Sequence, residues 1–74
     1  MTLREIFARN LRYWRAQRGL SQEQLALRTK ISRGYMSDLE REAHSASLDM
    51  VERIARVLAV EPAQLLDKSK PQKG

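Results

Sequence analysis

Two short helical patterns follow one another along the chain, over residues 21–29 and 32–41, with only a tight turn between them. Each pattern begins with a serine, Ser21 or Ser32, and serine caps helices because its hydroxyl accepts a hydrogen bond from a backbone amide of the first turn. Two helices that are joined so tightly must approach each other closely, which the small side chain of Ala26 permits. The spacing therefore predicts a compact pair of short helices.

The rest of the chain also predicts helices. The apolar residues at helical spacing are Leu3, Phe7, Leu11 and Trp14 in one segment and, after a cap at Ser47, Leu48, Val51, Ile54, Ala55 and Leu58 in another. Gly19 ends the first of these helices, and Pro62 begins a short last helix that ends near Leu66. We expect an all-α fold, a compact five-helix bundle over residues 1–66, followed by a disordered basic tail over residues 67–74.

The residue types argue against several classes of protein. Cysteine is absent and histidine occurs once, so we expect no disulfide and no metal site. Because the chain has 74 residues, no catalytic carboxylate cluster and no glycine-rich phosphate loop, we expect no enzyme, no cofactor and no small-molecule ligand. No apolar run reaches the roughly 20 residues of a membrane span, and no signal peptide is evident. We therefore expect a cytoplasmic domain without a membrane partner.

Basic charge is concentrated in the first part of the chain. The net charge is +5, and residues 1–18 contain five arginines and one acidic residue. Residues 42–66, in contrast, contain four acidic and two basic residues. A basic surplus on a small domain suggests a polyanionic partner, although scattered solubilising charge gives the same total.

The segment 32–41 is the candidate DNA-reading helix. Two short helices joined by a tight turn are typical of a helix-turn-helix unit, whose second helix lies in the major groove of double-stranded DNA. At about 100° per residue, the outward side of this segment is small, polar or basic. The residues predicted to contact bases are Arg33, Gly34, Ser37 and Asp38. Arg33 alternatively binds a phosphate, Gly34 is alternatively a neutral surface glycine, and Asp38 alternatively pairs with Arg33 or Arg41.

Phosphate contacts are expected at the ends of the two helices and in the loop that follows them. The candidates are Gln22, Ser32, Tyr35, Arg41, His44 and Ser45. Tyr35 alternatively belongs to the core, and His44 is alternatively a solvated loop residue. Arg15 and Glu40 are predicted to form a structural ion pair, because a carboxylate near the inward side is costly without a partner.

Taken together, these segments resemble the Cro and phage-repressor (XRE-like) type of helix-turn-helix regulator. The residues that carry the resemblance are Gly19-Leu20-Ser21-Gln22-Glu23-Gln24-Leu25-Ala26 and Ile31-Ser32-Arg33-Gly34-Tyr35-Met36-Ser37-Asp38-Leu39-Glu40-Arg41, and it continues through residues 47–58 and 62–66. The resemblance implies five helices, binding to operator DNA as a dimer, and repression or activation of transcription. Within this type, residues 33–37 and the short chain are similar to controller proteins of restriction–modification systems.

The sequence departs from this type at two places. Lys30 stands where the type has glycine in the turn, which costs about 1–2 kcal/mol if the backbone there is left-handed. Glu42 and Ala46 replace the usual glycine and proline of the loop that follows the helix over residues 32–41. A carboxylate at Glu42 close to phosphates would weaken binding.

An acidic surface should turn away from DNA, so the acidic part of the chain is the candidate homodimer surface. Its apolar residues are Val57, Leu58, Val60, Leu65 and Leu66, each of which alternatively belongs to the core. The competing function is that of an antitoxin or regulatory subunit, which acts mainly through protein–protein contacts. It is less favoured because residues 67–74 are too polar to dock firmly onto a partner.

Overall fold

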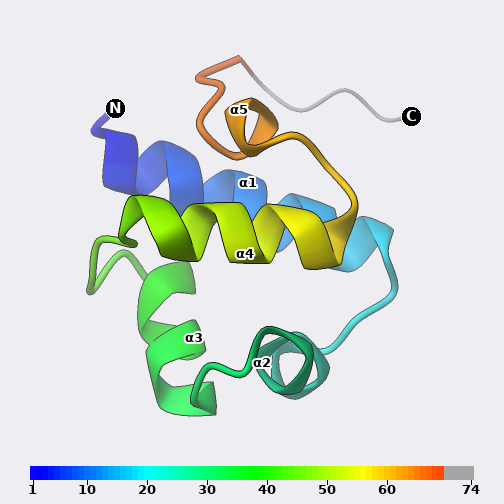
Figure 1. Ribbon diagram of the computed structural model, residues 1–74. Coiled ribbons are helices and arrows are strands. Elements are labelled where there is room, and N and C mark those ends of the chain that lie inside the picture. Colours follow the sequence, from blue (N-terminus) through cyan, green and yellow to red (C-terminus); the bar gives the residue numbers. More distant parts are fainter. Residues whose placement is uncertain (70–74) are drawn as a thin grey trace.

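The computed structural model describes residues 1–69 and contains five helices in that part of the chain. They are α1 (Leu3–Gln17), α2 (Gln22–Thr29), α3 (Arg33–Glu40), α4 (Leu48–Leu58) and α5 (Pro62–Leu65). Figure 1 shows α1 and α4 in the middle, with α2 and α3 on one side and α5 on the other. α2 packs against α3 and α4, whereas α1 packs against α3 and α5. The predicted all-α fold is confirmed, and residues 1–69 contain no strand.

Local side-chain caps fix where the helices begin. The three predicted serine caps are present, since Ser21, Ser32 and Ser47 each accept a hydrogen bond from the amide three residues further on. α1 begins at a cap that we did not predict, in which the Thr2 side chain accepts from the Glu5 amide and the Glu5 carboxylate accepts from the Thr2 amide. The hydrogen bond from the Thr2 backbone lowers the pKa of Glu5.

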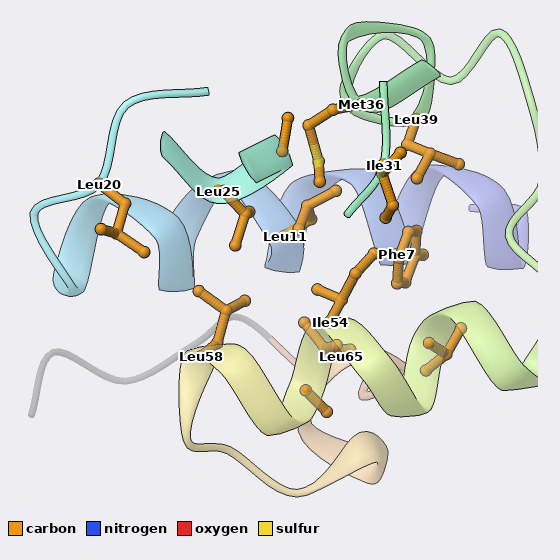
Figure 2. Packing of buried hydrophobic residues seen from close by; sticks show 13 residues of the cluster. Phe7, Leu11, Leu20, Leu25, Ile31, Met36, Leu39, Ile54, Leu58 and Leu65 are labelled. Atoms are coloured by element: carbon orange, nitrogen blue, oxygen red, sulfur yellow. The ribbon is translucent and has the colours of Figure 1, made fainter. Parts of the chain in front are cut away.

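One apolar cluster connects the helices (Figure 2). Leu11, Leu25 and Leu39 are fully buried within it, and Ile31 reaches it from the turn between α2 and α3. Complete burial of such a side chain stabilises a fold by about 1.5–3 kcal/mol. Because α3 contributes its inner side to this cluster, the core determines which side of α3 faces outward.

The apolar stripes of α1 and α4 extend further than the core does. Leu3 is 59% exposed and Leu48 is 82% exposed, although both belong to the apolar residues predicted at helical spacing. Each is the first residue of its helix, so the stripe runs past the neighbouring elements that could cover it. The later members of the α4 stripe are buried as predicted, and they are Val51, Ile54, Ala55 and Leu58.

The first residues of the predicted tail, 67–69, contact α1 through their backbone. Arg9 donates through Nη2 to the carbonyl oxygens of Asp67 and Ser69, at 2.9 Å each. The buried Asn10 donates through Nδ2 to the carbonyl oxygens of Leu65 and Asp67, at 3.0 and 2.9 Å. The chain is therefore held against α1 as far as Ser69, and the rest of the predicted tail, residues 70–74, lies outside the described residues.

The backbone at Lys30 and at Glu42, where the sequence has no glycine, is left-handed. Lys30 has a φ of 59°, so the turn between α2 and α3 places a lysine in the left-handed region. The turn closes because the Ile31 amide donates to the Ala26 carbonyl at 3.0 Å. Glu42 also has a positive φ, of 66°, in the loop after α3. Lys30 and Glu42 thus both occupy backbone conformations that favour glycine.

Candidate nucleic-acid interface

α3 presents a polar side to the exterior of the protein. Arg33 and Gly34 are exposed, and Ser37 and Asp38 are half-buried. The buried inner side consists of Met36, Leu39 and Glu40. At about 100° per residue, the four residues predicted to contact bases span about 140° of the helix surface. The structure thus brings them together on one side of α3.

Gly34 has no structural reason within the chain to be a glycine. A Cβ atom at this position would meet no other atom within 4 Å, and its φ is not positive. Glycine inside a helix nevertheless costs about 1 kcal/mol relative to alanine. Internal packing and backbone conformation are therefore excluded as explanations for this residue.

Arg33 pairs with a residue that the sequence analysis did not consider. Its Nη1 atom lies 3.7 Å from Oε2 of Glu23, in the first turn of α2. Both side chains are about two-thirds exposed, at 68% and 67%. The structure shows no other hydrogen bond or ion pair of Arg33 within residues 1–69. Most of the guanidinium donors therefore remain available to a partner outside the chain.

Asp38 ties α3 to the loop that follows it. Its Oδ1 atom lies 2.5 Å from Nη2 of Arg41, and its Oδ2 atom lies 3.4 Å from Nε2 of His44. The His44 ring also lies against the ring of Tyr35, with 5.8 Å between the centroids. Of the two partners that we weighed for Asp38, the structure contains Arg41 and not Arg33. Both carboxylate oxygens are thereby directed toward the loop.

The end of this loop is held by a residue far away in the sequence. The Tyr35 hydroxyl donates to the Ser45 carbonyl oxygen at 3.4 Å, so the half-buried tyrosine has both a core and a loop contact. Arg4 of α1 donates from Nε and Nη2 to the Ser45 hydroxyl, at 3.0 and 2.8 Å. Arg4 therefore adds a positive charge beside α3 that we did not predict. The excess of arginine in residues 1–18 was the available signal, but it did not single out Arg4.

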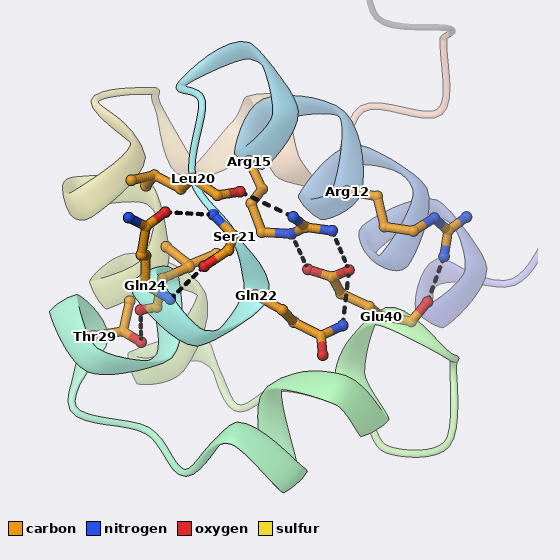
Figure 3. A network of polar contacts seen from close by, with 9 residues as sticks. Arg12, Arg15, Leu20, Ser21, Gln22, Gln24, Thr29 and Glu40 are labelled. Atoms are coloured by element: carbon orange, nitrogen blue, oxygen red, sulfur yellow. Dashed lines mark hydrogen bonds and ion pairs between the residues drawn. The ribbon is translucent and has the colours of Figure 1, made fainter.

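Glu40 lies at the centre of a polar network beneath α3 (Figure 3). Its carboxylate accepts hydrogen bonds from Arg15 Nε at 2.6 Å and Arg15 Nη2 at 3.0 Å, so the expected ion pair is present. Glu40 is only 4% exposed and Arg15 is 22% exposed. Arg12 donates to the Glu40 carbonyl oxygen, and Arg15 Nη1 donates to the Leu20 carbonyl oxygen at 2.9 Å. The pair connects α1 to the end of α3.

The same carboxylate orients a predicted phosphate contact. Gln22, at the start of α2, donates from Nε2 to Oε1 of Glu40 at 3.2 Å. An amide nitrogen carries two hydrogens, so Gln22 keeps a second donor. The hydroxyl of Ser32 accepts from the Tyr35 amide at 3.1 Å and likewise keeps its own hydrogen as a donor.

The candidate dimer surface is smaller than predicted. Leu58 and Leu65 follow the core alternative, because both are fully buried within the chain. They are therefore not available to a second protomer. Val57, Val60 and Leu66 are half-buried and pack against the core from its edge, so each retains some exposed area.

Two further features, a metal-binding cluster and a membrane-spanning helix, are absent from the described residues. Residues 1–69 contain no group of three or more histidine, cysteine, aspartate or glutamate residues arranged to hold a metal ion. None of the five helices is both long and apolar enough to cross a membrane.

A family model described as helix-turn-helix matches residues 11–65. This chain belongs to the helix-turn-helix family. The resemblance to XRE-type regulators is thereby confirmed. The match includes all of α2, α3, α4 and α5.

Relatives of this helix-turn-helix protein include regulators of restriction–modification systems. It is 39% identical to the control protein C.BamHI of Bacillus amyloliquefaciens over 66 residues. This aligned region covers 88% of this chain and 82% of the relative. The restriction–modification controller protein C.AhdI of Aeromonas hydrophila is 35% identical, with a TM-score of 0.80 over 84% of this chain and 94% of that one. The clp gene regulator ClgR of Corynebacterium glutamicum is 32% identical, with a TM-score of 0.85 over 89% and 70%.

These comparisons establish the general function. The protein is a DNA-binding transcription regulator of the helix-turn-helix family, and its family and relatives are regulators and not enzymes. The predicted class of function is confirmed.

Proposed function

We propose that this regulator binds a near-palindromic operator as a homodimer, with residues 32–41 of each protomer in the major groove. The observation that carries the proposal is the exposed polar side of α3, whose inner side is fixed by the core. In a two-fold dimer, two such helices lie roughly 34 Å apart, one turn of duplex DNA. The operator is expected to have two half-sites at that spacing.

Arg33 supplies the main base contact in this proposal. It stands at the first position of α3, it is exposed, and a guanidinium can bind guanine O6 and N7 through two parallel hydrogen bonds. Ser37 lies one turn further on the same side. The Asp38 carboxylate points toward Arg41 and His44 in the loop. Asp38 is therefore a positioning residue for those two side chains.

Phosphate contacts surround this reading surface. Gln22 and Ser32 offer their remaining donors from the starts of α2 and α3, where the helix dipoles also favour an anion. At the other end of α3, Arg41 is held by Asp38, and Arg4 is held by Ser45 of the following loop. If these two arginines each neutralise one phosphate, four contacts per dimer give a slope of about −3.6 for log affinity against log salt.

The dimer is proposed to form through the acidic part of the chain. Val57, Val60 and Leu66 are its apolar contacts, since they keep exposed area at the edge of the core. Sedimentation equilibrium tests this directly, because a Leu66→Lys variant should shift the protein toward the monomer. A Leu27→Lys variant is the matched control, since Leu27 is also an exposed apolar residue but belongs to α2 and lies outside that surface.

The similarity to C.BamHI and C.AhdI supports a role as a controller protein in the cytoplasm, where it would regulate the genes of a restriction–modification system. The test is to select binding sites from random duplexes with the purified protein and to map them onto the promoters beside its gene. Recovery of paired half-sites upstream of methyltransferase or endonuclease genes supports the proposal. Recovery of no preferred duplex, or an affinity indifferent to salt, refutes DNA recognition by this surface.

A further inference from the structure

Glu23 is an acidic residue on the surface that is proposed to meet DNA. It follows Gln22 in the first turn of α2, and its carboxylate is 67% exposed. Its ion-pair partner is Arg33, the proposed base-contacting residue, at 3.7 Å. An acidic side chain in this place is unexpected, because a carboxylate close to phosphates is repelled by them.

Glu23 and Arg33 form their ion pair at the protein surface, in an open groove. Glu23 and Arg33 line one groove between α2 and the start of α3, together with Leu27 and Lys30. Leu27 lies one turn after Glu23 and is 74% exposed, so no element within residues 1–69 covers this side of α2. The pair therefore faces solvent in the free protein and would face DNA in the complex.

The exposure of the pair shows how strongly it is held. An ion pair that is exposed on both sides contributes little to folding, so the arginine can leave its partner at little cost. The ion pair of Glu40 differs, since Glu40 is almost completely buried and makes hydrogen bonds to two residues. Arg33 can therefore leave Glu23 and bind a group of another molecule that offers a contact of similar strength.

We propose that Glu23 is a specificity-determining residue that restrains Arg33 from binding phosphates on DNA that lacks the correct guanine. A guanine offers two acceptors to the guanidinium, and this bidentate contact outweighs the single long contact with Glu23. A phosphate on unrelated DNA competes less well, because Glu23 holds the guanidinium and repels the phosphate at the same time. The inference rests on the proposed contact between Arg33 and a base.

The experiment compares Glu23→Gln with the wild type on the selected operator and on an unrelated duplex of equal length, over a range of salt concentrations. The matched control is Glu52→Gln, which makes the same change in charge on the exposed side of α4. Glu23→Gln should bind the unrelated duplex about fivefold more tightly per protomer, the factor expected for one charge interaction at about 4 Å in water. Its salt slope on that duplex should become steeper by about 0.9 per protomer, because Arg33 then neutralises a phosphate.

On the operator, Glu23→Gln should leave both the affinity and the salt slope unchanged, so that discrimination between the two duplexes falls about fivefold per protomer. Adding Arg33→Ala to Glu23→Gln should abolish the steeper slope on unrelated DNA. The inference is overturned if Glu23→Gln changes the slope on unrelated DNA no more than Glu52→Gln does, or if it only weakens operator binding. Wild-type protein that does not discriminate between the duplexes would instead refute the proposed function.

Discussion

Replacing Glu40 by methionine tests how much of the fold depends on the buried ion pair. The substitution Glu40→Met keeps the length of the side chain but removes the acceptor of three hydrogen bonds, two from Arg15 and one from Gln22. Arg15 then keeps its charge in a site that is 22% exposed, with the Leu20 carbonyl oxygen as its remaining partner at 2.9 Å.

The expected loss of stability is about 3 kcal/mol. Removing one partner of a buried ion pair generally costs about 3–5 kcal/mol, and the partial exposure of Arg15 places this case at the lower end. A domain of this size has a total stability of about 4–11 kcal/mol, so the variant should still fold at low temperature. Its melting temperature should fall by about 12–24 °C.

Urea denaturation followed by circular dichroism measures the free energy of unfolding of both proteins. The double variant Arg15→Met with Glu40→Met should recover part of the loss, because no unpaired charge then remains in the site. The exposed substitution Glu52→Met serves as a control that should change stability by about 0.5 kcal/mol or less. A loss below about 1 kcal/mol for Glu40→Met, or a double variant no more stable than the single one, would contradict the assigned role.

Three further substitutions probe the turn, the recognition helix and the first cap. Lys30→Gly should stabilise the protein by about 0.5–1 kcal/mol in urea denaturation, because release of the left-handed backbone exceeds the entropic cost of glycine; a destabilised variant would contradict this. Gly34→Ala should raise stability by up to about 1 kcal/mol, since its Cβ meets no atom, yet weaken operator binding; unchanged affinity refutes close approach of DNA. The lowered pKa of Glu5 means that its contribution is complete above the usual value of 4.5 and is lost as pH falls through the lower value in the folded protein. The difference in melting temperature between wild type and Glu5→Gln should therefore shrink in acid, and a difference that grows would refute the cap.

The parts of the fold that could be predicted from sequence depend on short-range chemistry. Ser21, Ser32 and Ser47 begin helices because each cap needs only an amide three residues away. The pairing of Arg15 with Glu40 could also be anticipated, because a carboxylate on the inward side of a helix requires a partner.

The parts that could not be predicted depend on where the chain places groups that are distant in sequence. Arg9 and Asn10 hold residues 65–69 through backbone carbonyl oxygens, which every residue has, so the side chains of that segment give no signal. Leu48 has the correct helical spacing for the core, but spacing does not show where the covering elements end. The contact between Arg4 and Ser45 likewise requires the relative position of α1 and the loop after α3.

The three carboxylates around α3 differ in burial, and burial determines what each can do. Glu40 is 4% exposed, so DNA cannot reach its ion pair, and the pair acts through stability and through the orientation of Gln22. Asp38 is 29% exposed and contacts two side chains, so it can hold Arg41 and His44 in place while both still face outward. Glu23 is 67% exposed and has a single long contact, with Arg33, so DNA can replace it as the partner of Arg33. Since the Coulomb interaction weakens as solvent exposure rises, only the outermost of the three can make a base contact conditional on the DNA sequence without destabilising the fold.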